Sequence, residues 1–211
     1  MTQLTILKTK EMLLCVADKV IENKPYLTEV DSAIGDGDHG IGMETGFLKV
    51  KEALGGADFD SVNQVFAAAG RAMLLSMGGA SGVIFGSLFS EGTKAVPQKD
   101  AFDAEDIALF FRGSLDAIKK RGRAAVGDKT MVDALEPAVI ALEENTKNGL
   151  NAMMAAAVIA AKAGMEKTKD MVAKFGRAKS LMERALGFQD AGATSVWIIF
   201  RSMHEFCEAD K

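Results

Sequence analysis

The amino-acid sequence predicts an all-α protein of about eight helices. Apolar residues recur at three- and four-residue steps along most of its 211 residues, which is the period of an amphipathic helix. Breaks that contain glycine or proline separate these stretches at short intervals. The one strand-like run, at 195–200, is equally compatible with a buried helix, and a lone strand would have no partner.

Four helices are expected in the first half of the chain. The first carries an apolar stripe that includes Leu13, Val16 and Val20, and Pro25 closes it. Gly55 and Gly56 end the second. The expected helices span 5–23, 42–54 and 60–77, and a fourth follows 78–82 and ends near residue 95.

The second half predicts four more helices. Pro137 stands inside the sixth and predicts a kink or a late start. The seventh is rich in alanine. The expected spans are 103–121, from about 131 onward, 150–174 and 193–207. No linker interrupts the series, so we expect a single domain over residues 1–211.

Four unusual connections are expected at one end of the bundle. Short loops favour antiparallel neighbours, so every second connection falls at the same end. One set is rich in glycine and charge and spans 31–40, 78–82, 122–130 and 176–192, whereas 55–59, 95–101 and 147–149 are ordinary polar turns. Four helix N-termini converge with the first set, and their free N–H groups suit phosphate.

Charge and composition exclude several classes of function. The net charge is −4, with acidic and basic residues interleaved, which argues against nucleic acid or an anionic membrane surface as the main partner. No run approaches the roughly 18 apolar residues of a membrane span, and the N-terminus lacks the features of a signal peptide. The two cysteines, Cys15 and Cys207, do not indicate a disulfide framework. We expect a cytoplasmic protein.

The first unusual connection holds three carboxylates, those of Asp31, Asp36 and Asp38. Carboxylates this close repel one another unless a cation lies between them, and interspersed glycines let the backbone aim several oxygens at one point. Each aspartate alone could instead cap a helix or form a turn. An EF-hand is excluded because Phe47 stands where its glutamate should be. We therefore expect a magnesium site.

Two glycine-rich stretches are suited to a phosphate ligand, but neither indicates a dinucleotide-binding fold. Residues 35–40 match the pattern GxGxxG, but no strand precedes them and two carboxylates would fill the pyrophosphate cradle. His39 could be a metal ligand, a donor to a phosphate or ribose oxygen, or a loop residue, and donation is favoured. The stretch 78–82 could join two close-packed helices or form a floor for a nucleotide, with Ser81 as a helix cap.

The stretch 122–130 comes within one residue of a Walker A loop. Asp128 breaks the pattern and no strand precedes it, so a P-loop is excluded. We expect Asp128 and Thr130 to cap the next helix, and Lys129 to be a phosphate contact or a solvated charge. Arg177 could be a surface arginine or, at this rim, could stabilise charge on a transferring phosphoryl group.

Five motifs, in this order, resemble the nucleotide-binding L subunit of dihydroxyacetone kinase over essentially the whole chain. They are GDGDHG at 35–40, GGASG at 78–82, GDKTM at 127–131, GRA at 176–178 and QDAGATS at 189–195. The resemblance implies a closed up-and-down barrel of eight antiparallel helices. It further implies that ADP or ATP binds with magnesium at one rim.

The same resemblance implies roles for single residues. Asp31, Asp36 and Asp38 would bind a pair of Mg²⁺ ions that bridge the phosphates, and Arg177 would stabilise charge during transfer. The residues implied around the nucleotide are His39, Gly40, Ile41, Gly42, Ala80, Ser81, Gly122, Met131, Arg177, Asp190, Ala191 and Gly192. Ala191 replaces a proline, and Phe188 a polar residue, that are common in the family.

The activity that the resemblance implies is phosphoryl transfer. A separate K subunit holds dihydroxyacetone covalently, and the L chain passes it the γ-phosphate of the nucleotide. In one branch an M subunit of the phosphotransferase system rephosphorylates ADP in place, and in the other ATP exchanges; a free-standing L chain favours the first. Two alternatives stay open, an ATP-dependent kinase for a related ketose such as erythrulose, and a nucleotide-loaded module that binds a transcription regulator.

Overall fold

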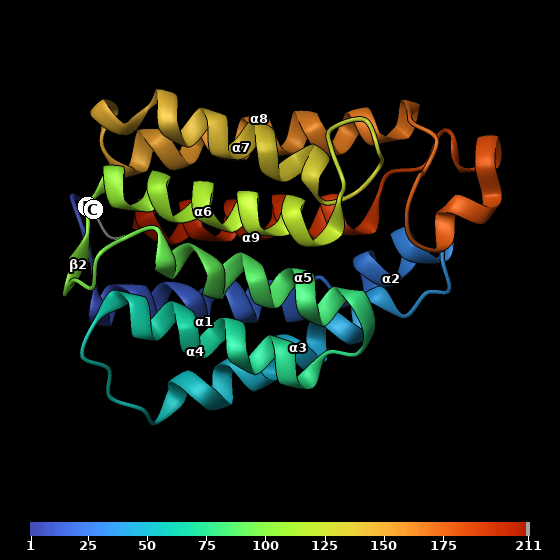
Figure 1. The fold of residues 1–211 in the computed structure, drawn as a ribbon. Coiled ribbons are helices and arrows are strands. Elements are labelled where there is room, and N and C mark those ends of the chain that lie inside the picture. The colour runs from blue at the N-terminus through green and yellow to red at the C-terminus, as the bar shows by residue number, and fades with distance from the viewer. Residues whose placement is uncertain (210–211) are drawn as a thin grey trace.

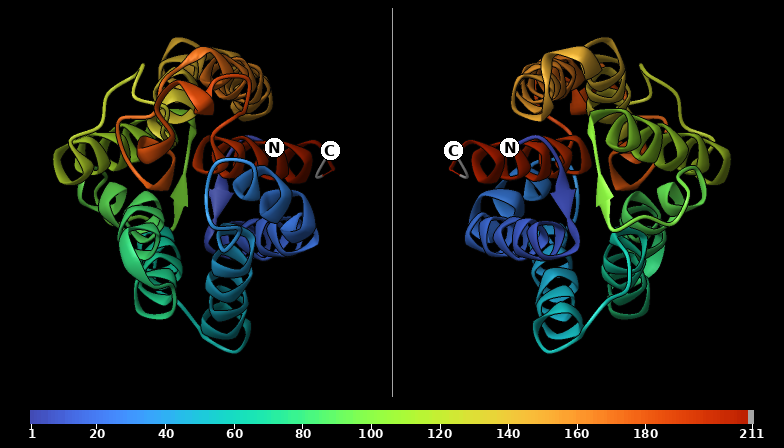
Figure 2. Two further views of the ribbon diagram at one scale, coloured as in Figure 1. Left: turned by 90° about the vertical axis from the view of Figure 1, so that its right-hand side faces the viewer. Right: turned by 90° about the vertical axis from the view of Figure 1, so that its left-hand side faces the viewer.

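A closed ring of eight long helices forms the body of the protein in the computed structural model, which describes residues 1–209. The helices are α1 (Ile6–Glu22), α3 (His39–Gly55), α4 (Val62–Ser76), α5 (Gly79–Ser90), α6 (Ala104–Gly122), α7 (Val132–Glu144), α8 (Leu150–Lys167) and α9 (Ala191–Ala209). Each packs against the next along the chain, and α9 packs against α1. The end-on views of Figure 2 show the helices arranged around a common centre. The predicted all-α fold is confirmed.

Shorter elements join the long helices. They are α2 (Lys24–Ser32), β1 (Leu4–Thr5), β2 (Ala101–Phe102) and the 3₁₀ helices η1 (Glu91–Lys94), η2 (Thr146–Asn148), η3 (Thr168–Asp170) and η4 (Arg177–Ala185). The two strands pair antiparallel, with Leu4 opposite Phe102. Helix α2 was not expected from the sequence. Pro25 lies in its first turn, where a proline starts a helix as readily as it ends the preceding one.

Three expected helix boundaries were wrong. Helix α3 begins at His39 rather than at residue 42, and α8 ends at Lys167 rather than at residue 174. After Lys167 the hydroxyl of Thr168 donates to the carbonyl of Met165, and the chain leaves the helix through η3. Helix α5 ends at Ser90 rather than near residue 95, and η1 follows it. Helix α7 begins at Val132, close to the expected start near residue 131, and continues through Pro137.

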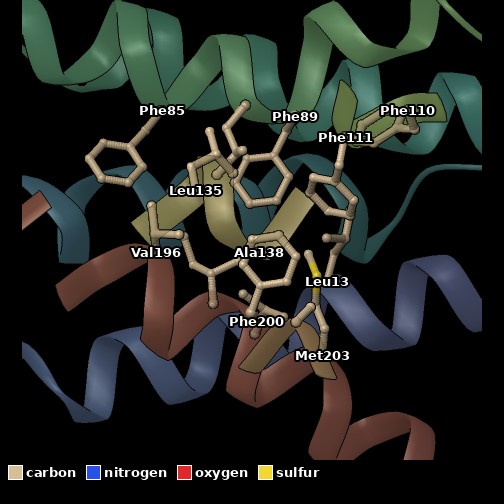
Figure 3. Close-up of a cluster of buried hydrophobic side chains, with 14 of the residues drawn as sticks. Leu13, Phe85, Phe89, Phe110, Phe111, Leu135, Ala138, Val196, Phe200 and Met203 are labelled. Atoms are coloured by element: carbon tan, nitrogen blue, oxygen red, sulfur yellow. The ribbon is translucent and has the colours of Figure 1, made fainter. Parts of the chain in front are cut away.

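The predicted apolar stripes face the interior of the ring. Figure 3 shows side chains from α5, α6, α7 and α9 that meet in one cluster, among them Phe89, Phe111, Ala138 and Phe200. Phe111 and Phe200 have ring centroids 5.0 Å apart. Within residues 1–209, no helix is both long and apolar enough to cross a membrane.

Helices α7 and α8 approach closely at Gly164. A Cβ atom added to Gly164 would overlap the carbonyl oxygen of Asp133. Pro137 lies four residues after Asp133 on α7, and proline has no N–H to donate to that carbonyl. The hydrogen-bond ladder of α7 is therefore interrupted where the backbone of α8 comes nearest.

This contact predicts that Gly164→Ala destabilises the protein by about 2–3 kcal/mol, as overpacking against rigid backbone does. Alanine in a helix otherwise favours folding by about 1 kcal/mol relative to glycine. Gly55→Ala supplies the control, because an added Cβ at Gly55 would meet nothing within 4 Å. Urea unfolding of both variants measures the effect, and equal stability of the two would show that no close contact exists at Gly164.

Candidate functional site

One cavity of about 810 Å³ lies at the end of the ring that holds α2 and the segment before α9 (Figure 1; left view of Figure 2). Its walls come from all four connections that were expected to share one end. The lining residues fall within 31–42, 77–85, 129–131, 175–178 and 190–192. Stretches that are far apart in the sequence therefore meet at one rim.

The three expected metal ligands lie together in this cavity. Asp31 is in the last turn of α2, and Asp38 directly precedes α3. One carboxylate oxygen from each of Asp31, Asp36 and Asp38 lies within 4.8 Å of the others. Gly35 allows the tight turn between them, because a Cβ there would overlap the Asp31 carboxylate.

These carboxylates fit a hard divalent cation. Oxygen ligands on opposite sides of a Mg²⁺ ion are roughly 4 Å apart, so small side-chain movements would bring all three oxygens to one ion. Burial, followed by the nearby charges of Asp36 and Asp31, raises the pKa of Asp38. Carboxylates that lie this close repel one another when they are ionised, and a bound cation removes that repulsion.

Helix N-termini surround the carboxylates. The first residues of α3 and α5 line the cavity, as does Met131, which directly precedes α7. The N-caps of α3 and α5 make no side-chain hydrogen bond, whereas Ser61 caps α4 at the opposite end. Uncapped N–H groups with the positive end of the helix dipole are suited to phosphate oxygens. Ser81 was expected as a cap but lies inside α5, and Gly78 takes the cap position.

The ring of His39 is held by contacts with α9 and α5. Its Nε2 is 2.8 Å from the hydroxyl of Ser195 on α9, and its ring is 5.9 Å from that of Phe85. Burial lowers the pKa of His39, so the imidazole is neutral at pH 7. The backbone N–H of His39 donates to Asp31 and helps to orient that carboxylate.

Two expected nucleotide contacts, Gly40 and Gly122, are not among the residues that line the cavity. Gly40 is buried where α3 crosses α2, and a Cβ there would overlap Thr28. Gly122 ends α6. The other expected contacts, from His39 to Gly192, do line the cavity.

Arg177 reaches the carboxylates from the segment 168–188, which carries η3 and η4 and which we call the Arg177 segment. Its guanidinium nitrogen lies 2.9 Å from a carboxylate oxygen of Asp36, although the Arg177 side chain is 75% exposed. This placement brings the predicted catalytic arginine next to the predicted metal ligands. Such an exposed pair contributes little to stability, typically about 0–1 kcal/mol.

The expectation for Lys129 was wrong. The residue is 2% exposed, and its ammonium donates to the carbonyl oxygens of Thr168, Ala185 and Phe188. It is therefore neither a solvated charge nor free to bind phosphate. No pattern in the sequence could reveal this role, because the acceptors are backbone atoms.

The caps expected before α7 were correct only in part. The hydroxyl of Thr130 accepts from Val132, but Asp128 instead accepts from Ala125 and pairs with Lys174. The loop is held by Asp133, which is buried and accepts the N–H groups of Gly127 and Thr130.

Asp190 caps α9 at the far wall of the cavity. Its carboxylate accepts the N–H of Ala193 at 2.7 Å. Burial raises the pKa of Asp190 to about 7, although the hydrogen bond from Ala193 opposes that change. The folded protein therefore holds a proton on this carboxyl between about pH 4 and pH 7, where the unfolded chain has lost it.

This pKa predicts that Asp190→Asn gains stability over the wild type as the pH rises. Because the wild-type native state binds the extra proton, its stability falls between about pH 4 and pH 7. Asparagine keeps the cap acceptor without the charge. We expect the stability of the variant relative to the wild type to rise by about 2–3 kcal/mol between pH 5 and pH 8, measured by urea unfolding. A constant difference across this range would contradict the shifted pKa, and Asp170→Asn, on the surface, is the control.

Comparisons with known proteins agree with one family. A family model described as "DAK2 domain" matches residues 33–205. The ADP-binding subunit DhaL of PEP-dependent dihydroxyacetone kinase 1 from Listeria innocua serovar 6a is 39% identical over 187 residues, which cover 88% of this chain and 89% of that protein. The corresponding subunit from Escherichia coli (strain K12) is 37% identical over 180 residues, which cover 84% of this chain and 86% of that protein.

Longer kinases are also similar to this chain. The D-erythrulose kinase of Mycolicibacterium smegmatis is 36% identical over 193 residues, which cover 89% of this chain but 33% of that protein. A crystal structure of the dihydroxyacetone kinase from C. freundii in complex with AMP-PNP and Mg²⁺ matches with a TM-score of 0.72 and 27% identity, over 93% of this chain and 33% of that chain.

Proposed function

Because this chain belongs to the DAK2 domain family, we propose that it is the nucleotide-binding subunit of a dihydroxyacetone kinase. It binds ADP or ATP with magnesium and passes the γ-phosphate to dihydroxyacetone held on a separate K subunit. The observation that carries this proposal is the cavity in which three carboxylates lie among uncapped helix N-termini. A cation site beside phosphate donors is what a magnesium-bound diphosphate requires.

Residues from different walls of the cavity have different roles in binding the nucleotide and in phosphoryl transfer. Asp31, Asp36 and Asp38 hold two Mg²⁺ ions, which neutralise charge on the phosphates. Backbone N–H groups at the starts of α3 and α5 orient the phosphate oxygens. Arg177 stabilises the charge that develops on the transferring group, so the protein acts by position and electrostatics.

Residues at the starts of α7 and α9 would hold the base and the ribose. The apolar side chain of Met131 would pack against the adenine face, and Asp190 would accept a hydrogen bond from the ribose or the adenine edge. Gly192 leaves room for this approach, because a Cβ there would stand 3.3 Å from the Cβ of Met131. A cavity of about 810 Å³ is within the range of nucleotide-sized ligand sites.

We favour the branch in which ADP remains bound and an M subunit rephosphorylates it. This proposal rests on the two similar subunits that are described as ADP-binding and PEP-dependent, each of which the chain matches over more than four fifths of its length. In this branch the nucleotide serves as a cofactor rather than as a substrate that leaves after each turnover.

Denaturing the purified protein and analysing what is released tests the branch. We expect about one ADP per chain that survives dialysis, and an empty protein that binds ATP reversibly would favour exchange instead. Reconstitution with K and M subunits tests the function itself. Triose phosphorylation should require this chain, and full activity without it would overturn the proposal.

A second candidate is an ATP-dependent kinase for a tetrose such as erythrulose, because a D-erythrulose kinase is among the similar proteins. Steady turnover of erythrulose with ATP and a K partner, without any phosphotransferase protein, would favour it. None of the similar proteins named above is described as binding a transcription regulator, so that alternative gains no support.

A further inference from the structure

The ammonium of Lys129 is a single point to which three parts of the Arg177 segment (168–188) are tied. Its Nζ lies 2.6 Å from the carbonyl oxygen of Thr168, 2.9 Å from that of Ala185 and 2.5 Å from that of Phe188. These carbonyls lie at the start of the segment, at the end of η4 and just before Asp190. One side chain therefore fixes the positions at which the segment leaves and rejoins the barrel.

The geometry of the Lys129 side chain is suited to binding these three carbonyl oxygens and leaves no donor for a ligand. An ammonium has three N–H donors, and all three have backbone acceptors here, so none remains for a ligand. The backbone of Lys129 has a φ of 60°, a conformation that costs energy for a residue with a Cβ and that tends to persist where surrounding contacts impose it. Burying a charge without a bonded carboxylate is also costly, which indicates a specific use.

The segment has other attachments to the rest of the protein, because the hydroxyl of Thr168 accepts the N–H of Asp190 and the guanidinium of Arg177 pairs with Asp36. Lys174 binds Asp128 through its side chain and its backbone N–H, but the Lys174 side chain is 66% exposed. Within the segment, Gly187 donates to Lys169 and closes it into a loop. Arg177 begins η4 in the middle of this loop, so its place at the cavity depends on how the loop is held.

We propose that Lys129 is a positioning residue, which holds the Arg177 segment closed over the cavity so that Arg177 reaches the carboxylate site. The consequence for nucleotide binding rests on the proposed function, whereas the closure of the segment does not. A residue that served global stability alone would weaken the whole barrel equally and would act independently of Arg177.

The test compares Lys129→Met with Lys174→Met, because both remove a lysine that links the segment to the loop before α7. Hydrogen exchange should accelerate about tenfold or more in residues 168–188 of Lys129→Met while the amides of α4 and α6 keep their protection. Lys174→Met should leave the segment protected. Uniform acceleration across all helices of Lys129→Met would overturn the proposal.

A double-mutant cycle on Mg·ADP affinity tests the link to Arg177. We expect Lys129→Met and Arg177→Ala each to weaken binding about tenfold, and the double variant to be weaker than the wild type by about tenfold as well, because both changes remove the same contact. Losses that multiply to about a hundredfold would show that Lys129 does not act through Arg177, and would overturn the proposal.

The two proposals fail in different ways. If the wild type binds no nucleotide, the proposed function fails, and the exchange experiment still decides whether Lys129 holds the segment. Lys129→Gln keeps two donors on a shorter side chain and replaces the methionine variant if that one does not fold. If neither folds, Lys129 supports the entire barrel and the positioning role is refuted.

Discussion

Asp38→Asn should lower the affinity for Mg·ADP by about 100-fold or more, and should at the same time stabilise the protein when no metal is present. The loss is expected because one of three charged ligands for magnesium becomes neutral. The gain is expected because burial and the charges of Asp36 and Asp31 disfavour the ionised Asp38, whose pKa is raised. A carboxylate that is only structural would not produce both effects.

The two effects are measured separately. Titration calorimetry with ADP and Mg²⁺ gives the affinity, and urea unfolding in EDTA gives the stability without metal. The raised pKa places the stability gain above about pH 4, where the carboxyl of the unfolded wild-type chain loses its proton more readily than that of the folded protein. Asp18→Asn is the control, because Asp18 is an exposed partner of Lys51 on another face. Unchanged affinity in Asp38→Asn would remove Asp38 from the metal site.

Periodicity in the sequence was sufficient to predict the eight long helices. The stripe through Leu13, Val16 and Val20 is buried as expected, because an amphipathic helix packs its apolar face against the core and leaves its polar face in solvent. Helix α2 was missed because Pro25 can end one helix and begin another. The pairing of β1 with β2 was missed because each strand has two residues, too few to show alternation.

The rim of the barrel was predictable for a different reason. Antiparallel helices put alternate connections at one end, and residues from all four expected connections line the cavity. Lys129 could not be predicted in the same way. Its acceptors are carbonyls that every residue carries, at sequence separations of 39 to 59, so neither residue type nor spacing marks the contact.

Arg177→Ala should reduce phosphoryl transfer far more than it reduces nucleotide binding. In this structure Arg177 pairs with Asp36 on the cavity rim, a position from which its guanidinium can reach a transferring phosphoryl group. A charge that is needed chiefly in the transition state affects turnover first. We expect the rate of transfer to fall about 100-fold or more, within the range for one stabilising group, and the ADP affinity to fall only about tenfold.

A single-turnover experiment measures the rate of transfer separately from the affinity. This chain, already loaded with ATP, is mixed with a K subunit that carries dihydroxyacetone, and no M subunit is needed. Arg184→Ala is the matched control, since Arg184 lies on the same η4 but is not among the residues that line the cavity. Its transfer rate should equal that of the wild type. If Arg177→Ala transferred phosphate at the wild-type rate, Arg177 would have no part in the transfer step, and its ion pair with Asp36 would be a feature of the nucleotide-free rim only. The metal ions and the helix N-termini would then have to stabilise the charge of the transition state without Arg177.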